Sequence, residues 1–165
     1  LNVHAIACSN RAVFAAANGD EESQIWRIPI RALETPELLG SADAQITAMA
    51  MSDDGHIVAT TKSEHAVSFL MMHPITGKTL LDIPIHVDSN TEFTSLCYDG
   101  ANQLLASTET SVGQLGVDFK QGRQRLIWTT LFLQKGTVGI ASDNGGSVFL
   151  LRATPAEGGL YRLTK

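Results

Sequence analysis

The stretch Ile46-Thr47-Ala48-Met49-Ala50-Met51-Ser52-Asp53-Asp54-Gly55 decides the fold of this chain, because its pattern occurs more than once. It is a short apolar run that ends in a polar turn, and residues 93–100 repeat this order 47 positions later. Asp-Gly after an apolar run is a hairpin signal, since Gly accepts a positive φ and Asp can bond its own backbone. Repetition at this period indicates stacked or radial modules.

Two further stretches fit the same frame. Residues 3–9 match it 43 positions before Ile46, and residues 142–151 look like the second half of another copy. We therefore expect four units, at 1–45, 46–91, 92–129 and 130–165. The last unit is irregular, because the offset from Leu104 to Val138 is only 34 residues, and we expect its first strand at 130–134.

Each unit is expected to form short antiparallel strands. In the second unit, four β-rich runs are separated by turns at 52–55, 62–65 and 73–78. The fold class is therefore all-β, with strands over at least about 45% of the residues and α-helix under about 10%. The apolar runs of the first two strands in each unit predict that four side chains are nearly fully buried: Ile6, Met49, Val58 and Leu96.

On these residues the chain resembles the WD40 family of β-propellers. Residues 46–55 are similar to the family's first strand and turn, residues 142–151 to its second turn and third strand, and Thr76-Gly77-Lys78 to the turn before its fourth. The Trp-Asp dipeptide of the family is absent, and Trp26-Arg27 stands in its place in the first unit. The resemblance implies blades of four antiparallel strands and a scaffold that carries partner proteins on its top face and rim.

Four blades are fewer than the roughly seven with which propellers of this kind usually close. Three outcomes are open. The remaining blades lie in another chain, they lie outside the sequence given, or four compact blades close alone. In the first two cases the end faces built from residues 3–8 and 160–163 should be covered by other strands, since an open apolar sheet face favours aggregation.

Composition argues against several classes of partner. The net charge is −5 and the 12 Lys and Arg residues are scattered, which argues against nucleic acid. The longest apolar runs hold about six residues, whereas a membrane-spanning helix needs about 20. The sequence starts without Met and without a charged-then-apolar leader, which favours the cytoplasm or nucleus. Cys8 and Cys97 are interpreted as small buried hydrophobes without a disulfide.

No pattern indicates catalysis, and we expect no catalytic, metal or cofactor residues. The five histidines are predicted to share no face, and no metal-ligand spacing is present. Carboxylates at 20–22, 53–54, 88, 92 and 99 lie in Gly- or Ser-flanked turns, where we expect them to be solvated. Neither a nucleophile motif nor a phosphate-binding loop leading into a helix occurs.

The function predicted from the sequence is a non-catalytic scaffold that binds other protein subunits. Bulky apolar groups near strand ends and nearby arginines are candidates for its interface, although packing between blades would also explain the apolar ones. The alternative is a propeller-based enzyme or exchange factor that inserts a top-face loop, at 31–37 or 87–92, into a substrate or a small GTPase. The candidate interface residues are Met71, Met72, Trp128, Phe132, Arg31 and Arg123.

Overall fold

The structure is a computed structural model that describes residues 2–20, 22–31, 35–120, 123–143, 147–154 and 158–163, without the side chains of residues 119, 120, 123 and 124. The described residues form fifteen strands and no helix, so the prediction of an all-β fold is confirmed. No helix that could span a membrane occurs among them.

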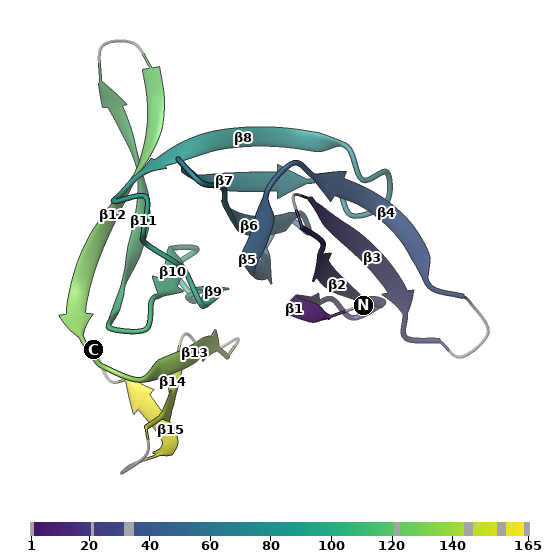
Figure 1. Cartoon of the computed structure of the whole chain (residues 1–165). Helices are drawn as coiled ribbons and strands as arrows, with labels where there is room; N and C mark the ends of the chain where they lie inside the picture. The colour runs from purple at the N-terminus through teal and green to yellow at the C-terminus, as the bar shows by residue number, and fades with distance from the viewer. Residues whose placement is uncertain are drawn as a thin grey trace.

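The strands form four groups in chain order (Figure 1). Group 1 contains β1 (Val3–Cys8), β2 (Ala12–Asn18), β3 (Ser23–Pro29) and β4 (Glu37–Ala42). Group 2 contains β5 (Gln45–Met51), β6 (Ile57–Lys62), β7 (Val67–Met72) and β8 (Thr79–His86). Group 3 contains β9 (Ser95–Tyr98), β10 (Leu104–Ser107), β11 (Ser111–Lys120) and β12 (Arg123–Leu133). Group 4 contains β13 (Thr137–Ser142), β14 (Val148–Ala153) and β15 (Gly158–Leu163).

Within each group, consecutive strands pair in antiparallel order. Groups 2 and 3 are also joined to each other, because the outer strands β8 and β12 pair in parallel, with Leu126 beside Ile85 and Ile127 beside His86. The result is one eight-stranded sheet in the order β5-β6-β7-β8-β12-β11-β10-β9. This bridge between the outer strands was not expected from the sequence, which predicts separate blades.

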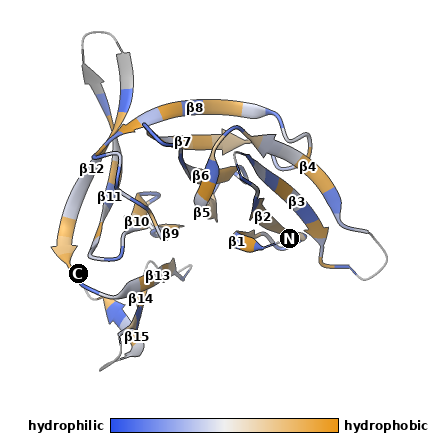
Figure 2. Cartoon of the chain, in the orientation of Figure 1, coloured by the Kyte–Doolittle hydropathy of each residue, from blue (hydrophilic) through white to orange (hydrophobic). Residues whose placement is uncertain are grey.

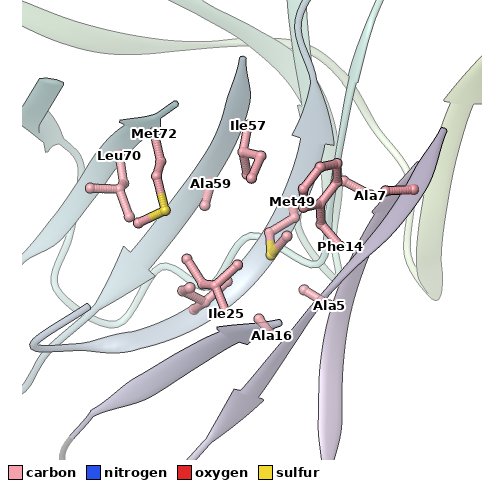
Figure 3. Packing of buried hydrophobic residues seen from close by; sticks show 12 residues of the cluster. Ala5, Ala7, Phe14, Ala16, Ile25, Met49, Ile57, Ala59, Leu70 and Met72 are labelled. Atoms are coloured by element: carbon pink, nitrogen blue, oxygen red, sulfur yellow. The ribbon is translucent and has the colours of Figure 1, made fainter. Parts of the chain in front are cut away.

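The groups lie around a common centre, with β1, β5, β9 and β13 nearest to it (Figure 1). A hydrophobic cluster fills each space between successive groups. The first, shown in Figure 3, packs small side chains of group 1 such as Ala5 and Ala16 against larger ones of group 2 such as Met49 and Leu70. Similar clusters join group 2 to group 3 and group 3 to group 4. The core is therefore divided among the sheet-to-sheet interfaces.

The turn after the inner strand is built in the same way in all four groups. In each, a side-chain oxygen accepts a hydrogen bond from a backbone N–H further along the turn, which fixes the local conformation. The capping residues are Ser9, Ser52, Asp99 and Asp143, with donors at Ala12, His56, Gln103 and Ser147. These four caps follow the spacing of the repeat predicted from the sequence.

The prediction for the last unit was wrong about its first strand. Residues 130–133 belong to β12, which runs on from group 3, so the expected boundary after residue 129 falls inside a strand. The inner strand of group 4 is β13, and its Ile140 lies 44 residues after Leu96. The apparent offset of 34 residues arose from comparing a second strand with a first one.

The burial prediction holds for three residues and fails for Ile6. Met49 is 5% exposed, Leu96 4% and Val58 0%, whereas Ile6 is 59% exposed. In β1 the buried side chains are Ala5 and Ala7, which face group 2, while Ile6 points to the opposite face of the sheet. That face of group 1 packs against no other strand group in the described part of the chain.

Candidate protein-interaction surface

The segment around Met71 and Met72 contributes an exposed apolar residue, but not one of the two methionines. Met72 is fully buried in the cluster between groups 1 and 2, and Met71 is half-buried. The exposed side chain is Ile75, at 72%, in the turn between β7 and β8. Met71 and Met72 stand in a strand covered on both sides, which their position near the strand end does not reveal.

In the segment around Trp128 and Phe132, too, the exposed residues are neighbours of the predicted ones. Trp128 packs edge-on against Phe93, with ring centroids 5.1 Å apart, and Phe132 packs against the cluster between groups 3 and 4. The exposed residues are Leu131 and Leu133, the latter at 81%. Figure 2 shows this end of β12 as hydrophobic. Alternation along the strand, which places every second side chain outward, could have identified them once the length of β12 was known.

Exposed leucines recur on the outer strands of the first three groups. We call them the rim leucines: Leu38 on β4, Leu80 on β8, and Leu131 and Leu133 on β12. The outer strands lie farthest from the centre of the molecule (Figure 1), where β8 and β12 pair with each other and these leucine side chains stay exposed. Scattered exposed leucines are common on soluble proteins, whereas apolar side chains on a shared rim are a feature of protein interfaces.

The candidate Arg31 lies beside two other arginines. The turn between β1 and β2 and the end of β3 are joined by a hydrogen bond from Ile30 N to Arg11 O of 3.0 Å. Between them is a cavity of about 410 Å³ lined by Asn10, Arg11, Arg27, Pro29, Ile30 and Arg31. The side chain of the last candidate, Arg123, lies outside the described residues.

The two loops of the alternative hypothesis lie at opposite ends of the strand groups. Successive turns of an antiparallel sheet alternate between its two ends, so the β3–β4 loop at 31–36 and the β8–β9 loop at 87–94 cannot converge. Part of the first loop, residues 32–34, lies outside the described residues. The second loop borders a cavity of about 470 Å³ that is lined by Glu92, Glu109, Trp128 and several hydroxyl side chains.

The histidines and carboxylates are arranged differently from the prediction in two places. His56 and His73 lie together, with ring centroids 6.1 Å apart, although the sequence predicted no shared face. Asp99 is buried rather than solvated, because its carboxylate accepts hydrogen bonds from the backbone N–H groups of Ala101 and Gln103. Among the described residues, no group of three or more His, Cys, Asp or Glu side chains could hold a metal ion.

The two cysteines have different environments, and neither forms a disulfide. Cys97 is buried between groups 3 and 4, and this burial raises the pKa of its thiol to about 12. Cys8 is exposed at the end of β1, on the same open face as Ile6. The prediction of a buried residue is confirmed for Cys97 and wrong for Cys8.

No protein-family model and no curated protein matches this sequence. Several solved structures are similar to this chain. The extracellular domain of a hybrid two-component system from Bacteroides thetaiotaomicron matches 99% of this chain over 21% of its own, with 17% identity and a TM-score of 0.61. A protein of unknown function from Bacteroides caccae matches 98% over 60% of its own chain, with 9% identity and a TM-score of 0.57.

A periplasmic gluconolactonase from Pseudomonas aeruginosa matches 98% of this chain over 56% of its own, with 12% identity and a TM-score of 0.58. At such identities the likeness shows the fold alone. The chain thus spans from about a fifth to three fifths of the length of these structures. Its radial strand groups, with a hydrophobic cluster between each group and the next, have the fold of a β-propeller.

Proposed function

We propose that this chain is the larger part of a WD40-like propeller domain that serves as a non-catalytic scaffold for other protein subunits. In this proposal the four strand groups are four blades of one domain over residues 1–165, and further blades complete the ring. The observation that supports further blades is the exposure of Ile6, compared with residues in the same position of the other groups. The rim leucines are the surface that we propose for the partner subunits.

The register identifies those residues. Ile6 pairs with Ala15 on the neighbouring strand, as Met49 pairs with Ala59 and Leu96 with Ala106. The corresponding residue of group 4 is Ile140, which is 6% exposed. Met49, Leu96 and Ile140 are buried because the preceding group packs onto them. Ile6 has the same position without such a neighbour, and its open face also carries Val13, Trp26 and Ile28.

The lengths of the similar structures support further blades in the same polypeptide. Two of them extend well beyond the part that this chain matches, since it covers 60% of one and 56% of the other. An open apolar face of several large side chains is unfavourable in water, and another sheet would cover it as group 1 covers Met49. The occupant we propose is a four-stranded unit that presents small side chains, as Ala5, Ala7 and Ala16 do.

Thiol labelling tests the proposal. In the isolated 165-residue chain, a maleimide should modify Cys8 quickly and Cys97 slowly, since Cys8 is exposed, whereas Cys97 is buried and this burial raises the pKa of its thiol. In the protein purified from its natural source, Cys8 should be protected as well. Equal reactivity of Cys8 in both samples would show that the face is open to water and would refute the proposal.

A photo-crosslinking side chain at Ile6 identifies the occupant, with the exposed Ile75 as the matched control position. The expected product joins residue 6 to a strand of a further repeat unit of the same polypeptide. A product within residues 137–163 would mean that the four groups close on themselves or pair with a second copy. A product with an unrelated protein would make this face a docking site for a partner instead of a contact between blades.

The enzyme alternative depends on the cavity beside the β8–β9 loop. It contains two carboxylates, Glu92 and Glu109, although Glu92 lies 3.2 Å from Lys62 in an ion pair. One similar structure is that of a gluconolactonase, so hydrolysis of a sugar lactone is the reaction to assay. Activity that disappears in Glu109→Gln would favour the enzyme, and inactivity of the source-purified protein would favour the scaffold.

A further inference from the structure

The cavity at the β1–β2 turn concentrates positive charge on an acidic protein. The chain has 12 Lys and Arg residues against 17 Asp and Glu. Three of the arginines, Arg11, Arg27 and Arg31, nevertheless line one cavity of about 410 Å³, together with the amide of Asn10. Among the residues that the structure describes, no acidic side chain lines it. The local charge therefore has the opposite sign to that of the whole molecule.

Two of the three guanidinium groups have no ion-pair partner in the part of the chain that the structure describes. Arg27 Nη1 lies 2.6 Å from Glu37 Oε1, so its charge is partly neutralised and its position is fixed. Arg11 and Arg31 are exposed and form no ion pair with any of the described residues. An Arg side chain offers five N–H donors in a planar fork that matches the oxygens of a carboxylate or a phosphate.

The backbone holds these residues near one another. Arg11 lies in the turn between β1 and β2, where Ser9 Oγ accepts hydrogen bonds from the N–H groups of Arg11 and Ala12. The hydrogen bond from Ile30 N to Arg11 O ties this turn to the residue that precedes Arg31. Two arginines that are 20 positions apart in the sequence are thereby held beside one cavity, on a hydrogen-bonded base.

We propose that this arginine cavity binds the oxyanion of a phosphate group, with Arg11 and Arg31 as its main ligands and Arg27 as a fixed third charge. The volume suits a single phosphate and the side chain that carries it, and charge-assisted N–H donors are the groups that bind phosphate most strongly. The phosphate belongs to a phosphorylated side chain of a partner protein, and this second step depends on the proposed scaffold function.

Calorimetric titration of the 165-residue chain at low salt tests the proposal with three probes. These are inorganic phosphate, an acidic peptide that contains phosphoserine, and the same peptide without phosphate. Inorganic phosphate and the phosphopeptide should bind, and the phosphopeptide should bind more tightly. The variant Arg11→Gln/Arg31→Gln should weaken both by about tenfold or more, because two charge-assisted contacts are lost. Both side chains are exposed, so the variant should keep the denaturation midpoint of the wild type.

The control variant is Lys78→Gln, which removes one exposed positive charge in the β7–β8 turn and should leave both affinities unchanged. An equal loss in the control would mean that anion binding depends on exposed positive charges in general and not on this cavity, which would overturn the proposal. Failure of inorganic phosphate and the phosphopeptide to bind would also overturn it. Equal affinity for inorganic phosphate and the phosphopeptide would support the oxyanion site and contradict a partner protein as the source of the phosphate. This outcome would not bear on the proposal that further blades complete the propeller.

Discussion

Groups 1 and 2 each have a row of three side chains at equivalent positions of the sheet. Only the row of group 2 is covered by a neighbouring sheet. Ile6, Ala15 and Trp26 lie side by side across three strands of group 1, as Met49, Ala59 and Leu70 do in group 2. The second row lies under group 1, while the first has no sheet in front of it. The difference in burial between Ile6 and Met49 therefore depends on the neighbouring group rather than on the sequence of the strand itself.

Shortening equivalent side chains to alanine should give the largest difference in stability between a covered and an uncovered position. Leu96→Ala should lower the free energy of unfolding by about 2–5 kcal/mol, because it leaves a cavity between groups 2 and 3. Ile6→Ala in the same 165-residue chain should change it by no more than about 0.5 kcal/mol, as at other exposed positions. Urea denaturation measures both, and equal losses would mean that Ile6 is already covered in solution.

The contact between groups 1 and 2 at the outer strands can be weakened through a single glycine. Gly77 has a φ of +67°, and a Cβ built on it would lie 1.8 Å from the carbonyl oxygen of Leu39 in β4. Gly55 has a φ of +87° with nothing within 4 Å, and is the matched control. Both Ala variants should lose about 1–2 kcal/mol from the left-handed backbone alone.

Gly77→Ala should lose about 1–3 kcal/mol more than Gly55→Ala, because the turn must move away from β4. Amide hydrogen exchange should then speed up in β4 for Gly77→Ala only. Similar exchange in both variants would show that the turn does not hold group 1 against group 2.

Groups 2 and 3 each contain a pair of hydrogen-bonded hydroxyl groups at equivalent positions. The two pairs should stabilise the folded chain equally. Thr47 Oγ1 lies 2.9 Å from Thr60 Oγ1, and Thr94 Oγ1 lies 2.9 Å from Ser107 Oγ. Thr47→Val and Thr94→Val should each cost about 1–2 kcal/mol, since a buried hydroxyl group loses a partner. The double variant Thr47→Val/Thr60→Val should recover part of the loss. Denaturation curves that differ widely between the two groups would contradict their equivalence.

The smallest expected effect concerns the turn of group 2. A hydrogen bond from Ser52 and the nearby His56 imidazole lower the pKa of Asp54. His56 Nδ1 lies 3.0 Å from Asp54 Oδ2 without the alignment of a hydrogen bond. A lowered pKa in the folded state favours folding above the pKa of the unfolded chain, and the benefit is lost as the pH falls through the folded value.

Ser52→Ala should therefore raise the pKa of Asp54, as followed by NMR titration of its carboxyl carbon. Ser63→Ala, which removes a similar cap in the next turn, should leave it unchanged. No change in Ser52→Ala would assign the lowered pKa to His56 instead.

The parts of the fold that depend on local sequence could be predicted. Turns such as 52–55 carry their own signal in Ser, Asp and Gly, and Ser52 does cap this turn. The first strand of group 4 could not be placed, because Thr130, Leu131 and Phe132 extend β12 with the same apolar character that marks an inner strand. A continuous apolar run does not reveal whether it belongs to the rim or the centre.

The candidate surface was predicted by segment but not by residue. Side chains alternate between the two faces of a strand, so an error of one position exchanges a buried residue for an exposed one, as with Phe132 and Leu133. The arginine cavity could not be predicted at all beyond Arg31. Asn10 and Arg11 lie in the β1–β2 turn and Arg27 lies in β3. Only the folding of group 1 brings them next to Arg31.

The parallel pairing of β8 with β12 has a mechanical consequence. It connects residues about 40 positions apart through backbone hydrogen bonds, so groups 2 and 3 can separate only if this bridge breaks as well as the apolar contacts. Groups 1 and 4 lack such a bridge among the described strands. If the chain is pulled from both termini, these two groups should peel away first, and the eight strands from β5 to β12 should give way last and together.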